Sequence, residues 1–183
     1  MASSFNTPYA TLSFAHLFQP RPRAEGGEAV FSCSLLFDPA AQKSPAYKAL
    51  QDACITVARE KFGANVNIGK LRMPFRDAGE KSDKYAGYNA GDTYINPWSK
   101  DKPGIVNAQR QDILLKEEVW AGQLVRANVT PFAYDTSGNK GVSFALNHVQ
   151  IVRTDTARID GRVAADKVFD DGEVDEYDGS SPF

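Results

Sequence analysis

Two long strand-like segments, Trp120–Tyr134 and Val142–Arg153, flank a short turn in the second half of the chain. Both are rich in β-branched and aromatic residues, which favour strands. The turn, Asp135–Lys140, has the sequence DTSGNK, and Gly, Asn, Asp and Ser are typical turn residues. The pattern predicts a long β-hairpin, bent or bulged at Pro131, because proline cannot donate a backbone hydrogen bond to a sheet. A hairpin of this length commits the chain to a fold in which strands dominate.

The first half of the chain adds shorter strands and one helix. Thr11–Phe18 and Ala29–Phe37 predict strands, the second with the alternation of a half-buried strand. A helix is predicted over Pro45–Phe62, because Ser44 can cap its start and apolar residues follow at helical spacing. Thr93–Asn96 predicts another strand. We therefore expect a mainly β fold, a β-barrel or a small α+β architecture, with one main α-helix inserted between early strands.

Composition excludes several classes of protein. With 42% hydrophobic and 11% aromatic residues, the chain is too apolar to be disordered throughout. No segment approaches the roughly 20 apolar residues of a membrane helix, so no membrane partner is expected. Met1–Tyr9 lacks the basic start and apolar centre of a secretory signal. Cys33 and Cys54 are too few for a disulfide scaffold, which fits a reducing, cytoplasmic setting.

The sequence carries no recognisable catalytic or cofactor motif. The two histidines, His16 and His148, lie far apart and have no Cys, Asp or Glu at a metal-ligand spacing. The glycines near Lys70 and Lys140 lack the GK[ST] ending of a phosphate-binding loop. We expect no enzyme activity, no metal and no cofactor.

Charge divides the chain into two parts. Residues 170–183 carry six acids and no base; the remaining 17 acids and 21 bases give residues 1–169 a net charge of +4. We predict one domain over 1–169 and a disordered acidic tail over 170–183, which ends on Phe183. Such a tail is either a solubility device or a regulatory, partner-docking segment. Its acidic residues are Asp170, Asp171, Glu173, Asp175, Glu176 and Asp178.

Basic and aromatic residues are interleaved between positions 70 and 102 and again in the hairpin. This mixture suits a single-stranded nucleic acid, whose phosphates attract Lys and Arg and whose unpaired bases stack on aromatic faces. In the hairpin, Val125, Ala127 and Val129 predict a core face, and the alternate residues predict a polar, aromatic and basic surface. The candidate DNA-binding residues are Lys70, Arg72, Phe75, Arg76, Lys84, Tyr85, Tyr88, Tyr94, Trp98, Lys100, Lys102, Arg126, Phe132, Tyr134 and Lys140.

Other interpretations of these residues stay open at this point. Any one of the aromatic side chains can instead pack beneath a neighbouring loop. The whole set can also form a protein interface, since interfaces are enriched in Tyr, Trp and Arg. The chain would then be a structural or protein-interaction β-module without affinity for nucleic acid. A third interpretation, that the chain is a metal-dependent nuclease, is supported only by scattered carboxylates.

Four stretches of the chain resemble a family of OB-fold single-stranded DNA-binding proteins of tailed bacteriophages and prophages. They occur in the family's order and cover most of residues 1–169. The chain departs from the family in its Arg21–Glu28 loop, which is often shorter in relatives. The four stretches are Leu12–Pro20 (LSFAHLFQP), Leu71–Asp77 (LRMPFRD), Tyr85–Pro103 (YAGYNAGDTYINPWSKDKP) and Trp120–Arg153.

The resemblance implies an OB-like barrel and non-catalytic coating of single-stranded DNA during phage replication or recombination, in the cytoplasm of the infected bacterial host. It also implies a function for the acidic tail. In such proteins, acidic tails that end in an aromatic residue dock replication or recombination partners and compete with DNA for the basic groove. The tail's six acids and Phe183 fit that arrangement.

Overall fold

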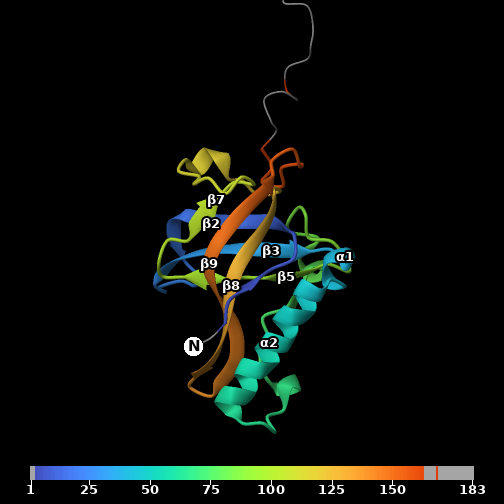
Figure 1. Ribbon diagram of the computed structural model, residues 1–183, viewed down its shortest axis with the longest axis vertical. Helices are drawn as coiled ribbons and strands as arrows, with labels where there is room; N and C mark the ends of the chain where they lie inside the picture. Colours follow the sequence, from blue (N-terminus) through green and yellow to red (C-terminus); the bar gives the residue numbers. More distant parts are fainter. Residues whose placement is uncertain (1–2, 163–167, 169–183) are drawn as a thin grey trace, which may run out of the picture.

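The computed structural model describes residues 3–162 and residue 168 (Figure 1). The acidic tail predicted over 170–183 lies outside these residues. Within the described part, no helix has both the length and the apolar composition needed to cross a membrane. The strands are β1 (Phe5–Asn6), β2 (Ala10–Pro22), β3 (Ala29–Phe37), β4 (Arg76–Asp77), β5 (Thr93–Ile95), β6 (Trp98–Ser99), β7 (Gly104–Val106), β8 (Leu124–Thr136) and β9 (Asn139–Arg153). The helices are α1 (Pro39–Gln42) and α2 (Pro45–Phe62), with short 3₁₀ turns at Ile68–Lys70, Ala78–Lys81 and Lys116–Glu118.

Five of the strands close into a barrel. β2 pairs with β3, β3 with β6, β6 with β9, β9 with β8, and β8 returns to β2. The pairs are antiparallel except that β6 and β9 run parallel. Figure 1 shows β8 and β9 as a long ribbon that crosses the more horizontal β2 and β3. This arrangement confirms the predicted mainly β fold with one main helix after early strands.

The hairpin of β8 and β9 is confirmed, but its predicted irregularity is in the wrong place. Pro131 pairs in register with Phe144. The register shifts instead next to Asn147 and Val152, where β9 carries one extra residue. Pro131 fits a regular strand because β1 and β2 pair with β8 only up to Val129, which leaves its missing N–H on an unpaired edge.

Helix α2 covers the lower half of this hairpin (Figure 1). The Ser44 hydroxyl accepts a 3.2 Å hydrogen bond from the backbone N–H of Tyr47, which confirms the predicted cap. The helix ends at Gly63, whose φ of 103° favours glycine. Its buried face, which includes Leu50 and Cys54, packs into the main core.

The barrel interior and a smaller cluster outside it form two separate cores. The main core takes Cys33, Leu35 and Phe37 from β3 and alternate residues of β8 and β9. Burial raises the pKa of both Cys33 and Cys54 to about 12. The second core lies on the opposite face of β3 and β5 and consists of Leu36, Ala78, Tyr88 and Tyr94, with Ile159 packed against it.

Candidate nucleic-acid interface

The outer face of the barrel presents a row of side chains across three strands. His16 of β2 pairs with Ser32 of β3, and Ser32 pairs with Trp98 of β6. Directly paired residues point to the same face of a sheet. Cys33 and Leu35, which alternate with this row, point into the core. The row of His16, Ser32 and Trp98 therefore lies on the outer face of the sheet and is partly accessible. Further along β3, the second core covers this same face.

A group of aromatic and basic side chains surrounds Trp98, and we call it the Trp98 cluster. The rings of Trp98 and Phe132 meet edge to face, with centroids 5.9 Å apart. The Arg23 guanidinium lies 5.1 Å from the centroid of the Trp98 ring, within range of a cation–π interaction. Phe132 comes from β8 and Trp98 from β6, so the barrel itself holds the two rings together. The cluster consists of Arg23, Arg76, Trp98, Phe132 and Tyr134.

The Trp98 cluster is electropositive. Partial burial and the charge of Arg76 lower the pKa of Arg23, and Tyr134 opposes this shift. Neither Arg23 nor Arg76 has an ion-pair partner among the described residues. Two guanidinium groups that repel each other, neither of them ion-paired within the described part of the chain, favour the binding of an anion such as a phosphate.

Close backbone packing fixes Tyr134 and the adjacent basic residues. Tyr134 pairs with Gly141 across the hairpin, and a Cβ atom at Gly141 would lie 2.6 Å from the Tyr134 hydroxyl. The glycine thus leaves room for the tyrosine ring. Arg72 donates a backbone hydrogen bond to the Lys140 carbonyl (3.1 Å) and accepts one from Val142 (2.9 Å). Arg72 and Lys140 are therefore held side by side at this end of the hairpin.

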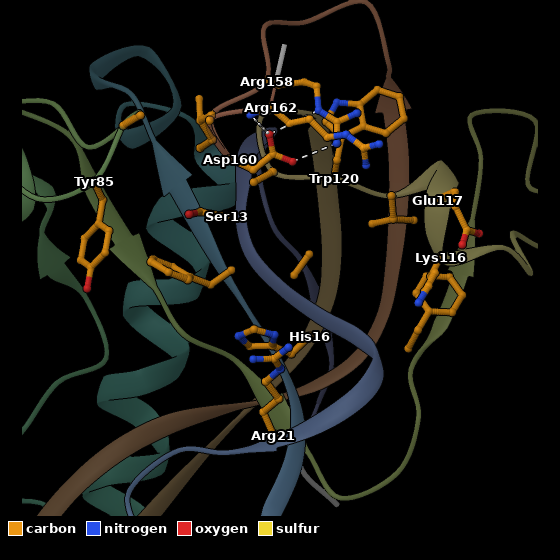
Figure 2. Close-up of a pocket in the computed structure, with 18 of the residues that line it drawn as sticks. Ser13, His16, Arg21, Tyr85, Lys116, Glu117, Trp120, Arg158, Asp160 and Arg162 are labelled. Carbon is orange, nitrogen blue, oxygen red and sulfur yellow. Dashed lines mark hydrogen bonds and ion pairs between the residues drawn. The ribbon is translucent and has the colours of Figure 1, made fainter. Parts of the chain in front are cut away.

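A cavity of about 840 Å³ opens on the other side of the His16 row (Figure 2). One wall is formed by residues 158–162, part of the segment 154–162 that we call the strap, so we name the cavity the strap pocket. Tyr85 lies on one side of it, His16 and Arg21 on another, and Trp120 with Arg158 and Arg162 on a third (Figure 2). Burial and the charge of Arg21 lower the pKa of His16.

The strap is anchored to the barrel by several contacts. Ile159 donates a backbone hydrogen bond to the Ala121 carbonyl (3.1 Å), and the Thr156 hydroxyl donates one to Gly122 (2.6 Å). Arg158 lies 4.9 Å from the Trp120 ring centroid and forms a 2.9 Å ion pair with Asp160. These contacts make the wall of the pocket an integral part of the fold.

Phe14 projects into the strap pocket from an irregular point in β2. Its φ of 44° lies in the left-handed region, and the β2–β3 register shifts between Ser13 and His16. Such a backbone costs a non-glycine residue about 1–3 kcal/mol. The strained bulge turns Phe14 outward, where it is 40% exposed beside Tyr85, which is 42% exposed. Their ring centroids are 4.9 Å apart.

The structure divides the predicted DNA-binding residues into five groups. Arg76, Trp98, Phe132 and Tyr134 meet in the Trp98 cluster, and Lys84 and Tyr85 line the strap pocket. Tyr88 and Tyr94 are buried in the second core, and Phe75 packs against the main core. Lys70, Arg72, Lys100, Lys102 and Lys140 are exposed, and Lys100 forms a 3.2 Å ion pair with Glu28. Arg126, bound to Gln150, lies about 20 Å along β8 from Phe132.

Several residues of the two sites were not among the predicted ones. Arg23 lies in the loop by which the sequence departs from the family pattern, and its position over Trp98 depends on the pairing of β3 with β6. Phe14 belongs to a predicted strand, but its outward direction depends on the bulge. Trp120 and Arg158 come together only through the strap. The basic run Arg21–Arg23 beside an aromatic strand was the one sequence signal available for this edge.

The described residues contain no group of three or more His, Cys, Asp or Glu side chains that could hold a metal ion. The titratable groups of the two sites are instead mainly basic, and the aromatic rings lie between them. The arrangement can bind an extended anion with planar, stackable groups.

Comparisons with known proteins agree with this geometry. A family described as the single-stranded DNA-binding protein of Enterobacter phage Enc34 matches residues 5–178. A search of curated proteins finds no match. The single-stranded DNA-binding protein of bacteriophage Enc34, solved in complex with single-stranded DNA, is similar in structure, with a TM-score of 0.73, 20% identity, and coverage of 85% of this chain and 88% of that one.

A second phage protein has the same fold. The chain is similar to gp2.5, a single-stranded DNA-binding protein of bacteriophage T7, with a TM-score of 0.59, 16% identity, and coverage of 97% and 98%. These likenesses confirm the predicted OB-like fold. The family match confirms the predicted resemblance and the prediction of a non-catalytic protein. The chain therefore belongs to the family of the single-stranded DNA-binding protein of Enterobacter phage Enc34.

Proposed function

We propose that this protein binds single-stranded DNA through the outer face of its barrel, with the Trp98 cluster at the centre of the interface. The observation that carries the proposal is the position of two arginines, which have no ion-pair partner among the described residues, beside the half-buried rings of Trp98 and Phe132. Family membership supports it, since the family is described by single-stranded DNA binding.

The two kinds of side chain bind two different parts of the DNA strand. Arg23 and Arg76 contact phosphate oxygens, which removes the repulsion between their charges. Bases stack against Trp98 and Phe132, at about 1–3 kcal/mol for each base. Five exposed basic side chains attract the phosphate backbone to the protein surface; they are Lys70, Arg72, Lys100, Lys102 and Lys140. Stacking and phosphate contacts do not read a base sequence, so binding has little sequence preference.

Tyr88 and Tyr94 are not part of the proposed interface, because neither exposes more than 3% of its surface. Their rings support the loop that carries Lys84 and Tyr85. Arg126 is also left out, because of its distance along β8 and its 2.6 Å hydrogen bond to Gln150.

The acidic tail competes with DNA for this basic surface and docks partner proteins of phage replication or recombination in the host cytoplasm. Arg162, which lines the strap pocket, precedes Asp170 by eight residues, an extended reach of at most about 29 Å. The tail's six acids are thus tethered at high effective concentration near the basic surface. Bound DNA displaces them and frees Phe183 for a partner.

A fluorescence titration tests DNA binding directly. Oligo-dT is added to the full chain, and the emission of Trp98 and Trp120 is followed beside an equal-length duplex control. We expect quenching by oligo-dT at lower concentration than by the duplex. Equal binding of both would replace stacking by a general electrostatic surface, and binding of neither would favour a protein-interaction module.

Deletion of residues 170–183 tests the tail. We expect tighter binding to oligo-dT and a steeper loss of affinity with added salt, because in the full chain salt also weakens the competing tail. A chain in which the six acids are changed to Asn or Gln, with Phe183 kept, separates competition from docking. Unchanged affinity in both variants would contradict the competition.

A further inference from the structure

We infer that the strap pocket is a second nucleotide-binding subsite, in which Phe14 and Tyr85 hold a base of the same DNA strand that crosses the Trp98 cluster. This inference rests on the proposed function and extends it. It gives the bound strand a path with two stacking points, one on each side of the His16 row.

The strained conformation of Phe14 is the first observation behind this inference. A phenylalanine in a strand gains most by turning into the core, yet the bulge in β2 directs this one outward. Bulges near functional sites often re-aim a side chain in this way. The exposed ring contacts Tyr85, which is itself more than two-fifths exposed, and the pair presents aromatic surface to the cavity.

The charge of the pocket is the second observation. Its lining contains five Lys or Arg side chains and two carboxylates, Glu117 and Asp160, a net charge of +3. The carboxylate of Asp160 is already paired with Arg158 at 2.9 Å. The remaining cations flank the aromatic pair, with Lys84 beside Tyr85 in sequence and Arg21 beyond His16. Aromatic faces between cations are the features of a single-strand site.

The two subsites lie close enough to share one strand of DNA. His16 lines the strap pocket and is joined through Ser32 to Trp98, two strand spacings away. At about 4.8 Å for each spacing, the Cα atoms of His16 and Trp98 are about 10 Å apart. Ser32 and His16 carry no negative charge, so these two residues between the subsites do not repel the DNA backbone.

Two variants of the full chain test the second subsite. Tyr85→Leu removes one ring, and Phe14→Asn removes the other with a residue that tolerates the left-handed conformation. Tyr9→Leu is the matched control, because Tyr9 is 54% exposed but lies outside the pocket. We expect each pocket variant to weaken binding of an oligo-dT of about 16 nucleotides roughly tenfold, and the control to leave it unchanged.

Two further readouts separate base contact from a structural role. In the unsubstituted chain, photocrosslinking to oligonucleotides that contain 5-iododeoxyuridine should give an adduct at Phe14 or Tyr85. The thermal midpoint of Phe14→Asn should stay the same or rise, because strain is relieved; a merely structural Phe14 would make it fall.

The outcomes also distinguish this inference from the proposed function. If the unsubstituted chain fails to bind oligo-dT, the proposed function is wrong. If the Tyr85→Leu and Phe14→Asn chains both bind oligo-dT with full affinity, and no adduct forms at either ring of the unsubstituted chain, the second subsite is wrong. The proposed interface at the Trp98 cluster is then unaffected.

Discussion

The Trp98 cluster and the second core lie on the same face of the same sheet, yet their aromatic residues differ in burial. Tyr88 and Tyr94 are closed over by Leu36, Ala78 and Ile159. Trp98 and Phe132 are only half-buried, and the Arg23 guanidinium lies over the Trp98 ring. An aromatic residue in a basic segment thus has no fixed role. Accessibility, together with cations that form no ion pair among the described residues, distinguishes the proposed binding surface.

The largest expected effect is a loss of folding stability when a residue of the second core is changed. Tyr88→Ala should lower the free energy of unfolding by about 3–5 kcal/mol, since it removes a buried ring and the hydroxyl that donates to Ser13. Urea unfolding measures this loss. The affinity of the folded fraction for oligo-dT should stay within about twofold. A stable Tyr88→Ala chain with much weaker DNA binding would show that Tyr88 contacts bases. The second core and the Trp98 cluster would then not differ in function.

Trp98→Ala provides the opposite case. It should weaken oligo-dT binding by about 1–3 kcal/mol, because one stacking surface is lost. The loss is best measured by anisotropy with a labelled oligonucleotide, since the substitution removes one of the two tryptophan signals. Phe132→Leu should have an effect in the same direction. Normal affinity in both variants would move the interface away from the Trp98 cluster.

The arginines of the Trp98 cluster should mainly determine how strongly the affinity for DNA depends on salt, and should contribute less to the stacking of bases. Arg23→Gln and Arg76→Gln should each make the slope of log K against log salt shallower by about 0.7, the value for one phosphate contact on a single strand. Arg59→Gln, on the exposed side of α2, serves as the control. If all three variants change the slope equally, the cluster has no special electrostatic role.

His16, on the row between the two subsites, should give the smallest effect. Burial and Arg21 lower its folded pKa below the ordinary value of 6.5. The unfolded chain therefore binds the proton more readily, and stability should fall as pH drops below about 6.5. His16→Gln should reduce this fall in urea unfolding between about pH 5 and pH 7. An identical pH profile in both chains would contradict the assigned shift.

Local patterns in the sequence predicted much of the fold, because they depend on neighbours in the chain. The cap at Ser44 and the apolar spacing behind it located α2, and alternation located β3 and the hairpin. Closure of the barrel depends on β6, a strand of two residues that pairs parallel with β9 far along the sequence. Neither its length nor its partner leaves a local signal. The bulge at Asn147 was missed because Pro131 offered a more visible, but incorrect, candidate.

The candidate site was predictable in residue type but not in arrangement. Tyr85 and Tyr88 stand three positions apart in one basic, aromatic segment, and sequence alone treats them alike. Leu36 and Ile159, from distant parts of the chain, decide that Tyr88 is buried. Arg23 likewise reaches Trp98 across 75 positions. Contacts over such separations come from the closed sheet and cannot be read from spacing.

Because both thiols are buried, the native protein should not react with alkylating reagents. Only a thiolate reacts at a useful rate, and with a pKa of about 12 each cysteine holds its proton at neutral pH. Cys33 lies inside the barrel and Cys54 on the buried face of α2, so the two report on different parts of the molecule. Pulsed alkylation followed by peptide mapping would therefore time the opening of barrel and helix separately. An added surface cysteine, in turn, would accept a label in the otherwise unreactive chain.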